Sequence, residues 1–167
     1  MSYEWPLYLC LFLALWSAVI AGVFSAFSEF IMSALLRAAP AAGIESMQHI
    51  NRTVLKTQFV AGILLISVFS ILFAAYGFFV YEGTALALIL LASLAYVSCV
   101  FLVTMFGNVP MNKKLEEFDY RSVAAADYWI EYGRVWTRLN HFRSVGGILT
   151  AGLYAFAAII LIHSGQV

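Results

Sequence analysis

Residues 59–106 read FVAGILLISVFSILFAAYGFFVYEGTALALILLASLAYVSCVFLVTMF, two apolar runs separated by the short stretch YEGTA at positions 81–85. Each run, 59–80 and 86–106, has close to the roughly 20 residues that an α-helix needs to cross a ~30 Å hydrocarbon core. A connection this short leaves room only for a tight turn. The stretch therefore predicts two antiparallel, neighbouring membrane helices.

Two more apolar runs, 7–27 and 146–162, flank this hairpin in the sequence. The chain is 63% hydrophobic and 11% charged, far outside the range that is typical of soluble globular proteins. We therefore expect an all-α fold, a polytopic membrane four-helix bundle that forms one domain over residues 1–167. The segment before the first run has no basic residue, so we interpret that run as a membrane helix rather than as a secretory signal.

All nine Lys and Arg residues fall in two segments between the apolar runs, 33–58 and 107–145. Cytoplasmic loops of membrane proteins retain Lys and Arg, so this distribution predicts that both segments are cytoplasmic. The N and C termini are then outside, periplasmic or extracellular, and the expected location is a bacterial inner membrane. A formal net charge of zero, with basic and acidic residues mixed, gives no indication of nucleic-acid binding.

The two cytoplasmic segments are expected to extend the helices beyond the membrane. Helical spacing of apolar residues after Pro40 predicts one long helix from about residue 41 to residue 80. The third span is expected to end near residues 108–110. Ser122 is expected to cap a final helix that reaches Ile162. That helix would be about 60 Å long, twice the thickness of the hydrocarbon core.

Small residues recur every four positions in the first and fourth runs, which lets helix backbones approach closely in lipid. We expect these residues to pack within the bundle, with a homodimer interface as the alternative. Cys10 and Cys99 are predicted to differ in depth by roughly 15 Å. A disulfide needs Cα atoms within about 7 Å, so we expect no pairing. The two ladders of small residues are Ala14, Ala18, Gly22 and Ala26, and Gly147, Ala151 and Ala155.

Residues 128–143, YWIEYGRVWTRLNHFR, carry most of the candidate site residues. The aromatic residues alone fit an interfacial belt that anchors the helix at the lipid headgroups. An Asn and a His that enter a membrane span are instead expected to face the bundle interior and find partners there. At helical spacing, one face collects Trp129, Tyr132, Trp136, Leu139, Asn140 and Arg143, and a neighbouring ridge collects Arg134, Arg138 and His141.

His141 is the best candidate for a general base, because imidazole accepts and donates protons near neutral pH. The alternative is a histidine that is hydrogen-bonded to a carbonyl or a carboxylate. Glu29, at the inner end of the first run, is the second catalytic candidate. Its alternative role is a salt bridge to Arg52, Lys56 or Arg143.

Three asparagines outside the apolar runs are candidate ligand contacts. Asn51 lies on the apolar side of its predicted helix, and Asn108 and Asn112 follow the third run. Their amides could bind a ligand carbonyl, whereas Asn108 and Asn112 could also cap helix ends. The sequence has no Glu-x-x-His or His-x-x-x-His pair, a spacing that is frequent in bundle metal sites. We therefore predict no cofactor, with a metal at Glu29, His49 and His141 as the alternative.

At these residues the chain resembles the anthrone-oxygenase-like family of four-helix membrane proteins, over nearly its whole length. The resemblance rests on four blocks in order: GVFSAFSEFIM at 22–32, GIESMQHIN at 43–51, FGNVPMN at 106–112 and WTRLNHFR at 136–143. The family pattern has a proline after Met32, where this chain has Ser33, so the first helix is expected to run further. His49 stands where the family pattern has a small residue, which weakens its case as a ligand.

The resemblance implies that an anthrone is oxidised to an anthraquinone by O₂. His141 would remove the acidic C–H proton, and Asn140, Asn108 or Arg143 would stabilise the resulting oxyanion. Aromatic walls would hold a flat substrate that arrives from the membrane. The candidate positions that the resemblance carries over are Asn51, Asn108, Asn112, Trp136, Asn140, His141 and Arg143, and the expected walls are Phe27, Phe106, Trp129 and Trp136.

Three function classes follow. The first is a membrane-embedded oxygenase that acts on a lipophilic aromatic, anthrone-type substrate at the cytoplasmic membrane edge. The second is a non-catalytic membrane protein that binds a lipid, a quinone or a partner helix. The third is a metal-dependent membrane redox enzyme. The expected partners are membrane lipid, a lipophilic small molecule, O₂ if the protein is an enzyme, and a second copy of the chain if the small residues form a homodimer.

Overall fold

A computed structural model describes residues 4–164, and its regular structure is helical throughout this range. A first continuous helical segment consists of α1 (Trp5–Ala26), the π-helix η1 (Phe27–Ile31) and α2 (Met32–Arg37). After α3 (Pro40–Val54) and α4 (Gln58–Val80), a second continuous segment consists of α5 (Gly83–Ala95), the π-helices η2 (Tyr96–Leu102) and η3 (Thr104–Asn108), and α6 (Val109–Glu116). The last helix is α7 (Val123–Ser164).

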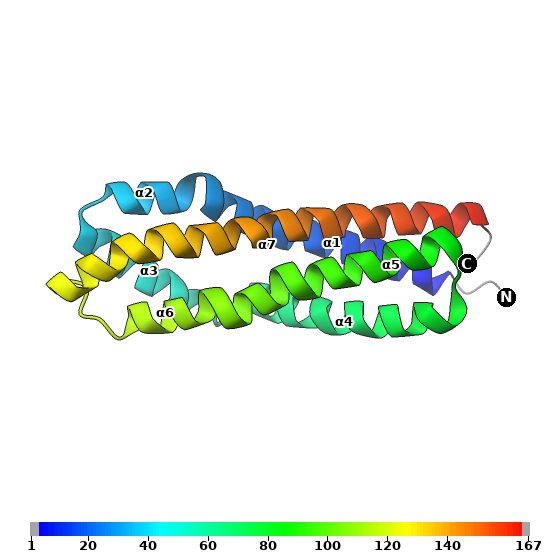
Figure 1. Cartoon of the computed structure of the whole chain (residues 1–167), viewed down its shortest axis with the longest axis horizontal. Coiled ribbons are helices and arrows are strands. Elements are labelled where there is room, and N and C mark those ends of the chain that lie inside the picture. Colours follow the sequence, from blue (N-terminus) through cyan, green and yellow to red (C-terminus); the bar gives the residue numbers. More distant parts are fainter. Residues whose placement is uncertain (1–3, 165–167) are drawn as a thin grey trace.

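Four of the described helical segments are long and apolar enough to cross a membrane: Trp5–Arg37, Gln58–Val80, Gly83–Glu116 and Val123–Ser164. They run side by side as an elongated bundle (Figure 1). The α4–α5 turn, the start of α1 and the end of α7 lie at one end of the bundle, which we call the turn end. The helix α3 lies at the opposite end with α2, α6 and the start of α7, which we call the polar end. This all-α bundle confirms the predicted fold class and is the architecture of an integral membrane protein.

Three predicted helix boundaries are confirmed. The α4–α5 connection is a tight turn in which Gly83 has a φ of 62°, a conformation that favours glycine. The first helix runs past Ser33 as far as Arg37. The hydroxyl of Ser122 accepts the Ala125 backbone N–H at 3.1 Å and so caps α7, which continues for 42 residues, into the bundle and on to the turn end.

Two predicted boundaries are wrong. No single helix runs from 41 to 80, because Thr57 adopts an extended conformation between α3 and α4, and its hydroxyl donates to the Val54 carbonyl at 2.7 Å. The third membrane segment does not end near residues 108–110 but continues to Glu116. Proline lacks an N–H and clashes with the preceding helical turn. Here the turn before Pro110 is the wider π-helix η3, and Pro110 is in the first turn of α6, so the chain continues as a helix.

The bundle is held by close contacts between α1 and α7. A Cβ added to Gly147 would lie 2.8 Å from the Ala21 Cβ, so this position requires glycine. Gly147 therefore packs within the bundle, as expected for its small-residue ladder. On the first ladder Ala18 and Gly22 are exposed, and the homodimer stays a prediction. Cys10 and Cys99 are both free.

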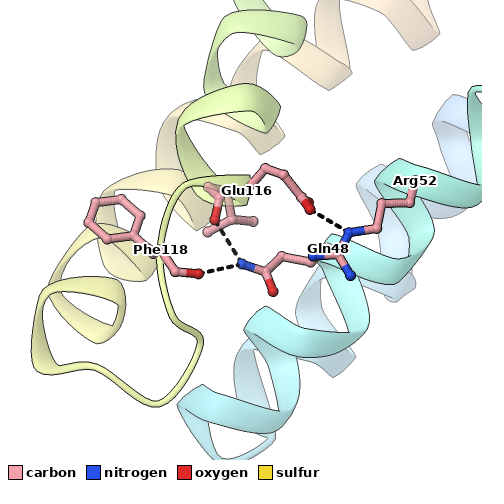
Figure 2. A network of polar contacts seen from close by, with 5 residues as sticks. Gln48, Arg52, Glu116 and Phe118 are labelled. Carbon is pink, nitrogen blue, oxygen red and sulfur yellow. Dashed lines mark hydrogen bonds and ion pairs between the residues drawn. The ribbon is translucent and has the colours of Figure 1, made fainter.

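The polar end has its own hydrophobic core, and hydrogen bonds and an ion pair link its helices. Gln48 on α3 donates to the backbone carbonyl of Leu115 at 2.9 Å and to that of Phe118 at 3.0 Å. One turn further along α3, Arg52 forms an ion pair with Glu116. Figure 2 shows how these contacts fasten α3 to the end of α6 and to the α6–α7 connection. The core beneath them consists of Met32, Ile44, Met47, Leu115, Ala125, Tyr128, Trp129, Tyr132 and Trp136.

Candidate functional site

The aromatic residues that the sequence places on one face of α7 are buried at the polar end. Trp129, Tyr132 and Trp136 are at most 4% exposed. The Trp129 and Tyr132 rings stack at a centroid distance of 5.4 Å, and the Tyr132 and Trp136 rings at 5.9 Å. The predicted common face is confirmed. The alternative of an interfacial belt is wrong for these three residues, because they pack inside the protein.

Three asparagines surround this aromatic stack. The Asn112 carbonyl oxygen accepts the Tyr132 hydroxyl at 2.7 Å and the Trp136 indole N–H at 2.8 Å. The Asn108 amide donates to the Trp136 backbone carbonyl at 3.2 Å, and its side chain caps no helix. Asn51 reaches the same layer from α3 and lies against the Tyr132 hydroxyl. The structure thus brings together the three amides that the sequence identified, one from α3 and two from the continuous η3–α6 segment.

Asn140 and Arg143 form a second buried group, toward the membrane-spanning part of α7. The Asn140 amide donates to the Phe24 carbonyl at 2.6 Å and to the Ser28 hydroxyl at 2.7 Å. Its carbonyl oxygen accepts a guanidinium N–H of Arg143 at 2.6 Å. The Arg143 guanidinium also lies over the Phe24 ring at 4.1 Å and over the Trp136 ring at 5.2 Å. This buried cation is therefore stabilised by one amide and two aromatic faces.

Four buried polar atoms of these two groups have no partner among the described residues. They are Asn51 Nδ2, Asn108 Oδ1, Trp129 Nε1 and Arg143 Nε. Buried polar groups are normally hydrogen-bonded, so each unsatisfied one is a place where a water molecule or a ligand would be stabilised. The other hydrogen bonds of the two groups go to protein partners: backbone carbonyls, Ser28 and one another.

His141 lies on the outer surface of α7, which corrects the expectation that it faces the interior with Asn140. Its side chain is exposed and lines a groove between α7 and the η1–α2 segment. Consecutive residues of a helix point about 100° apart, so His141 points away from the buried Asn140 face, and no other helix covers it there. The groove has a volume of about 460 Å³ and is lined by Ser28, Met32, Ser33, Leu36, Arg37, Gly133, Arg134, Thr137, Arg138 and His141.

The groove communicates with the buried group through Ser28. This residue lines the groove, and its hydroxyl accepts the Asn140 amide inside the protein. Thr137 also lines the groove, and its hydroxyl is buried without a partner among the described residues. Ser28 belongs to the π-helix η1, a widened turn of a kind that is frequent at functional sites. The groove thus has the His141 imidazole at its surface and is bordered by Ser28 and Thr137, with the Thr137 hydroxyl buried beneath it.

Glu29 and His49 do not join this arrangement. Both are exposed, and neither lines the groove. The expected salt bridge of Glu29 is wrong: Arg52 pairs with Glu116, Arg143 bonds to Asn140, and no ion pair of Glu29 occurs in residues 4–164. Across the same range, no three His, Cys, Asp or Glu side chains lie together as metal ligands would. The structure therefore does not assemble Glu29, His49 and His141 into one site.

Sequence reasoning missed Ser28, Thr137 and Arg37 as groove residues. Helical spacing predicted the ridge of Arg134, Arg138 and His141 on α7. It did not predict that the η1–α2 segment faces this ridge. Ser28 carried a usable signal, because a serine at the inner end of an apolar run needs a polar partner. Ser33, in place of the family's proline, indicated that the first helix continues, but no local signal indicated that its extension would bring Arg37 against α7.

A comparison with protein families identifies one family. The family model described as anthrone oxygenase matches residues 47–153. The matched range includes α7 from its start through the candidate residues, as well as Asn51, Asn108 and Asn112. No curated protein and no solved structure matches the chain.

Proposed function

This chain belongs to the anthrone oxygenase family, and from that membership we propose that it is a membrane-embedded oxygenase for a lipophilic aromatic substrate of the anthrone type. The substrate would occupy the groove between η1–α2 and α7. Support comes from the groove's composition, because pockets of about 300–1,000 Å³ with apolar walls and a few polar groups are typical of small-molecule sites.

The orientation that we propose follows from charge. All nine Lys and Arg residues lie outside the four apolar runs and toward the polar end, so the polar end faces the cytoplasm and the turn end faces outward. In a bacterium this places the chain in the inner membrane. Phe30 and Phe142, 61% and 57% exposed, lie next to the groove residues in the sequence and would contact lipid. A lipophilic substrate could then enter the groove from the bilayer.

A single observation carries the proposal: His141, Ser28 and Thr137 line one groove. An anthrone C–H that lies between two rings and opposite a carbonyl is acidic, so His141 would take its proton. The electron pair would move onto the carbonyl oxygen, to which the Ser28 hydroxyl would donate a hydrogen bond. O₂ would then oxidise this anion. Overall, the CH₂ group and O₂ become a C=O group and one molecule of water.

Asn140 and Arg143 would act as positioning residues. Asn140 bonds to Ser28 from inside the bundle, and Arg143 holds the Asn140 carbonyl oxygen. Their proposed role is to fix the Ser28 hydroxyl toward the groove and to place positive charge behind it. Asn51, Asn108, Asn112, Trp129 and Trp136 would support the same wall and, through their unsatisfied atoms, could contact part of a ligand. Glu29 would be a surface residue in this proposal.

The test is O₂ uptake by membranes that contain the protein, with a simple anthrone added. Membranes without the protein correct for slow spontaneous oxidation. His141→Ala should reduce the excess uptake by at least about 10²-fold, a usual contribution of a general base. The matched control is His163→Ala, because His163 is also exposed but lies at the turn end. Equal uptake by the His141→Ala variant would refute the proposed base, and loss of uptake with a chelator would indicate a metal.

A second candidate function is a non-catalytic protein that binds a lipid or a quinone. It is favoured by one observation, that the polar side chains of the interior are bonded to other protein groups: Tyr132 and Trp136 donate to Asn112, and Asn140 bonds to Phe24, Ser28 and Arg143. This function predicts ligand binding in the groove without any O₂ uptake above the empty-membrane control.

A further inference from the structure

The groove also contains a cluster of positive charge. Arg37 reaches it from α2, and Arg134 and Arg138 reach it from α7, one helical turn apart. His141 lines the same groove as these three arginines, and none of the residues that line it is acidic. The guanidinium group stays charged under all ordinary conditions, so repulsion between these groups cannot be relieved by loss of a proton.

No carboxylate neutralises these three arginines within residues 4–164, where the ion pair found is that of Arg52 with Glu116. Several other basic side chains have partners. Lys114 lies 4.3 Å from the centre of the Tyr128 ring, and Arg121 lies 5.1 Å from that of Tyr120. Arg143 bonds to Asn140. Of the basic side chains left without such a partner among the described residues, Arg37, Arg134 and Arg138 share the groove, whereas Lys56 and Lys113 lie outside it.

Two acidic residues of α7, Asp127 and Glu131, lie close in sequence to the arginines of the groove. Asp127 lines an adjoining groove of about 520 Å³, which shares Leu36, Gly133 and Arg134 with the first one. Asp127 and Arg134 form no ion pair. Glu131 is exposed and lines neither groove. Within residues 4–164, no acidic side chain is therefore paired with Arg37, Arg134 or Arg138.

The same groove has apolar walls. Met32 and Leu36 line it from α2, and the Leu36 side chain lies so close to Gly133 that an added Cβ would be 2.5 Å from it. Glycine at 133 thus permits α2 to sit directly on α7. A ligand in this space would contact hydrocarbon on one side and guanidinium groups on the other, the environment of an amphiphilic anion.

We propose that Arg37, Arg134 and Arg138 form an anion subsite of the groove, and that its ligand is an amphiphile with an anionic head and an apolar body. Two sources have this chemistry: a lipophilic aromatic acid and an anionic phospholipid. For the aromatic acid, the inference deepens the proposed function and rests on it for the reaction. The binding itself does not depend on any oxygenase activity.

The test uses the full chain in nanodiscs of phosphatidylcholine, with two fluorescent probes of the same ring system. An anthracene carboxylate carries the charge, and its methyl ester is neutral. The carboxylate should bind more tightly, and Arg134→Gln or Arg138→Gln should each weaken it roughly fivefold, as expected for one basic residue at a membrane surface. Arg121→Gln removes the same charge outside the groove and should leave the affinity unchanged. Helix content and thermal midpoint confirm that each variant is folded.

A second arm separates the two sources. Phosphatidylglycerol is added to the nanodiscs at increasing fractions. If it displaces the carboxylate, the subsite takes a phospholipid headgroup, and if the carboxylate stays bound, the subsite takes the aromatic acid. Either result supports the anion subsite. Equal affinities for carboxylate and ester, or unchanged carboxylate binding in both arginine variants, would overturn it.

The two proposals fail in different ways. If membranes oxidise a neutral anthrone but the carboxylate probe shows no preference, the oxygenase proposal stands and the anion subsite is refuted. If the carboxylate binds through Arg134 and Arg138 and no O₂ uptake occurs with any anthrone, the anion subsite stands and the oxygenase proposal is refuted.

Discussion

The contact between Asn140 and Arg143 permits a quantitative test of the buried group. Asn140 is completely buried and makes three hydrogen bonds, to the Phe24 carbonyl, to the Ser28 hydroxyl and from Arg143. Asn140→Leu removes all three. It also removes the hydrogen-bond partner that Arg143 has among the described residues, and Arg143 is only 6% exposed.

The expected loss is about 3 kcal/mol. A buried ion that loses its partner costs about 3–5 kcal/mol, and the lower value applies because the Phe24 and Trp136 rings still cover the guanidinium. For a chain of this size, each kcal/mol lowers the thermal midpoint by about 2–4 °C. Asn140→Leu should therefore lower the midpoint by about 6–12 °C.

A double-mutant cycle separates this contact from simple loss of packing. Arg143→Met keeps an unbranched side chain against the two rings but removes the charge. In the Arg143→Met background, Asn140→Leu no longer leaves a buried cation without a hydrogen-bond partner. The double variant should therefore be more stable than the sum of the two single effects predicts, by about 2 kcal/mol. The assay is thermal unfolding of the purified chain in detergent, followed by circular dichroism. Additive single effects, or a midpoint shift below about 2 °C for Asn140→Leu, would refute this account of the buried group.

Three further predictions concern the fold. Gly147→Leu should lower the free energy of unfolding by more than about 2 kcal/mol, because the larger side chain would overpack against α1. The matched control is Gly152→Leu, which should be close to neutral because an added Cβ there meets no atom within 4 Å. Equal thermal midpoints of the two variants would contradict the close α1–α7 packing at Gly147. Gln48→Leu should lower the free energy of unfolding by about 2 kcal/mol, because it removes two hydrogen bonds. It should also speed tryptic cleavage of the α6–α7 connection. An unchanged cleavage rate would show that Gln48 does not hold α3 against that connection. Arg52→Met or Glu116→Gln should change stability by less than about 1 kcal/mol, because both partners of the ion pair are exposed; a larger effect would indicate that the pair is buried in the membrane-bound protein.

The elements that could be predicted are those that depend on local sequence. The four long helices follow from runs of apolar residues, because a chain in lipid must satisfy its backbone hydrogen bonds within each segment. The cap of α7 follows from Ser122, and the turn after α4 from a glycine in a five-residue connection. The common face of Trp129 and Trp136 follows from helical spacing alone.

The failed predictions involve places where local preference competes with packing. The break at Thr57 separates α3 from α4, although no glycine or proline occurs there to indicate a helix end. Pro110 lies in a helix that continues because a π-turn precedes it, and nothing in the sequence around the proline indicated that turn. His141 illustrates the same limit for the site, because periodicity put it on a ridge beside the Asn140 face but did not tell which of the two faces the bundle would bury.

By itself, the sequence determined that this chain has four membrane-length helices, that its basic residues gather at one end and that its amides and aromatics share helix faces. These properties depend on residue order and on the period of the helix. The tertiary structure decided that α2 lies on α7, that Ser28 reaches Asn140 and that His141 opens onto a groove with three arginines. Such contacts join residues that are more than 90 positions apart in the sequence, and they depend on which small residues let the helices approach, which only the packed bundle reveals.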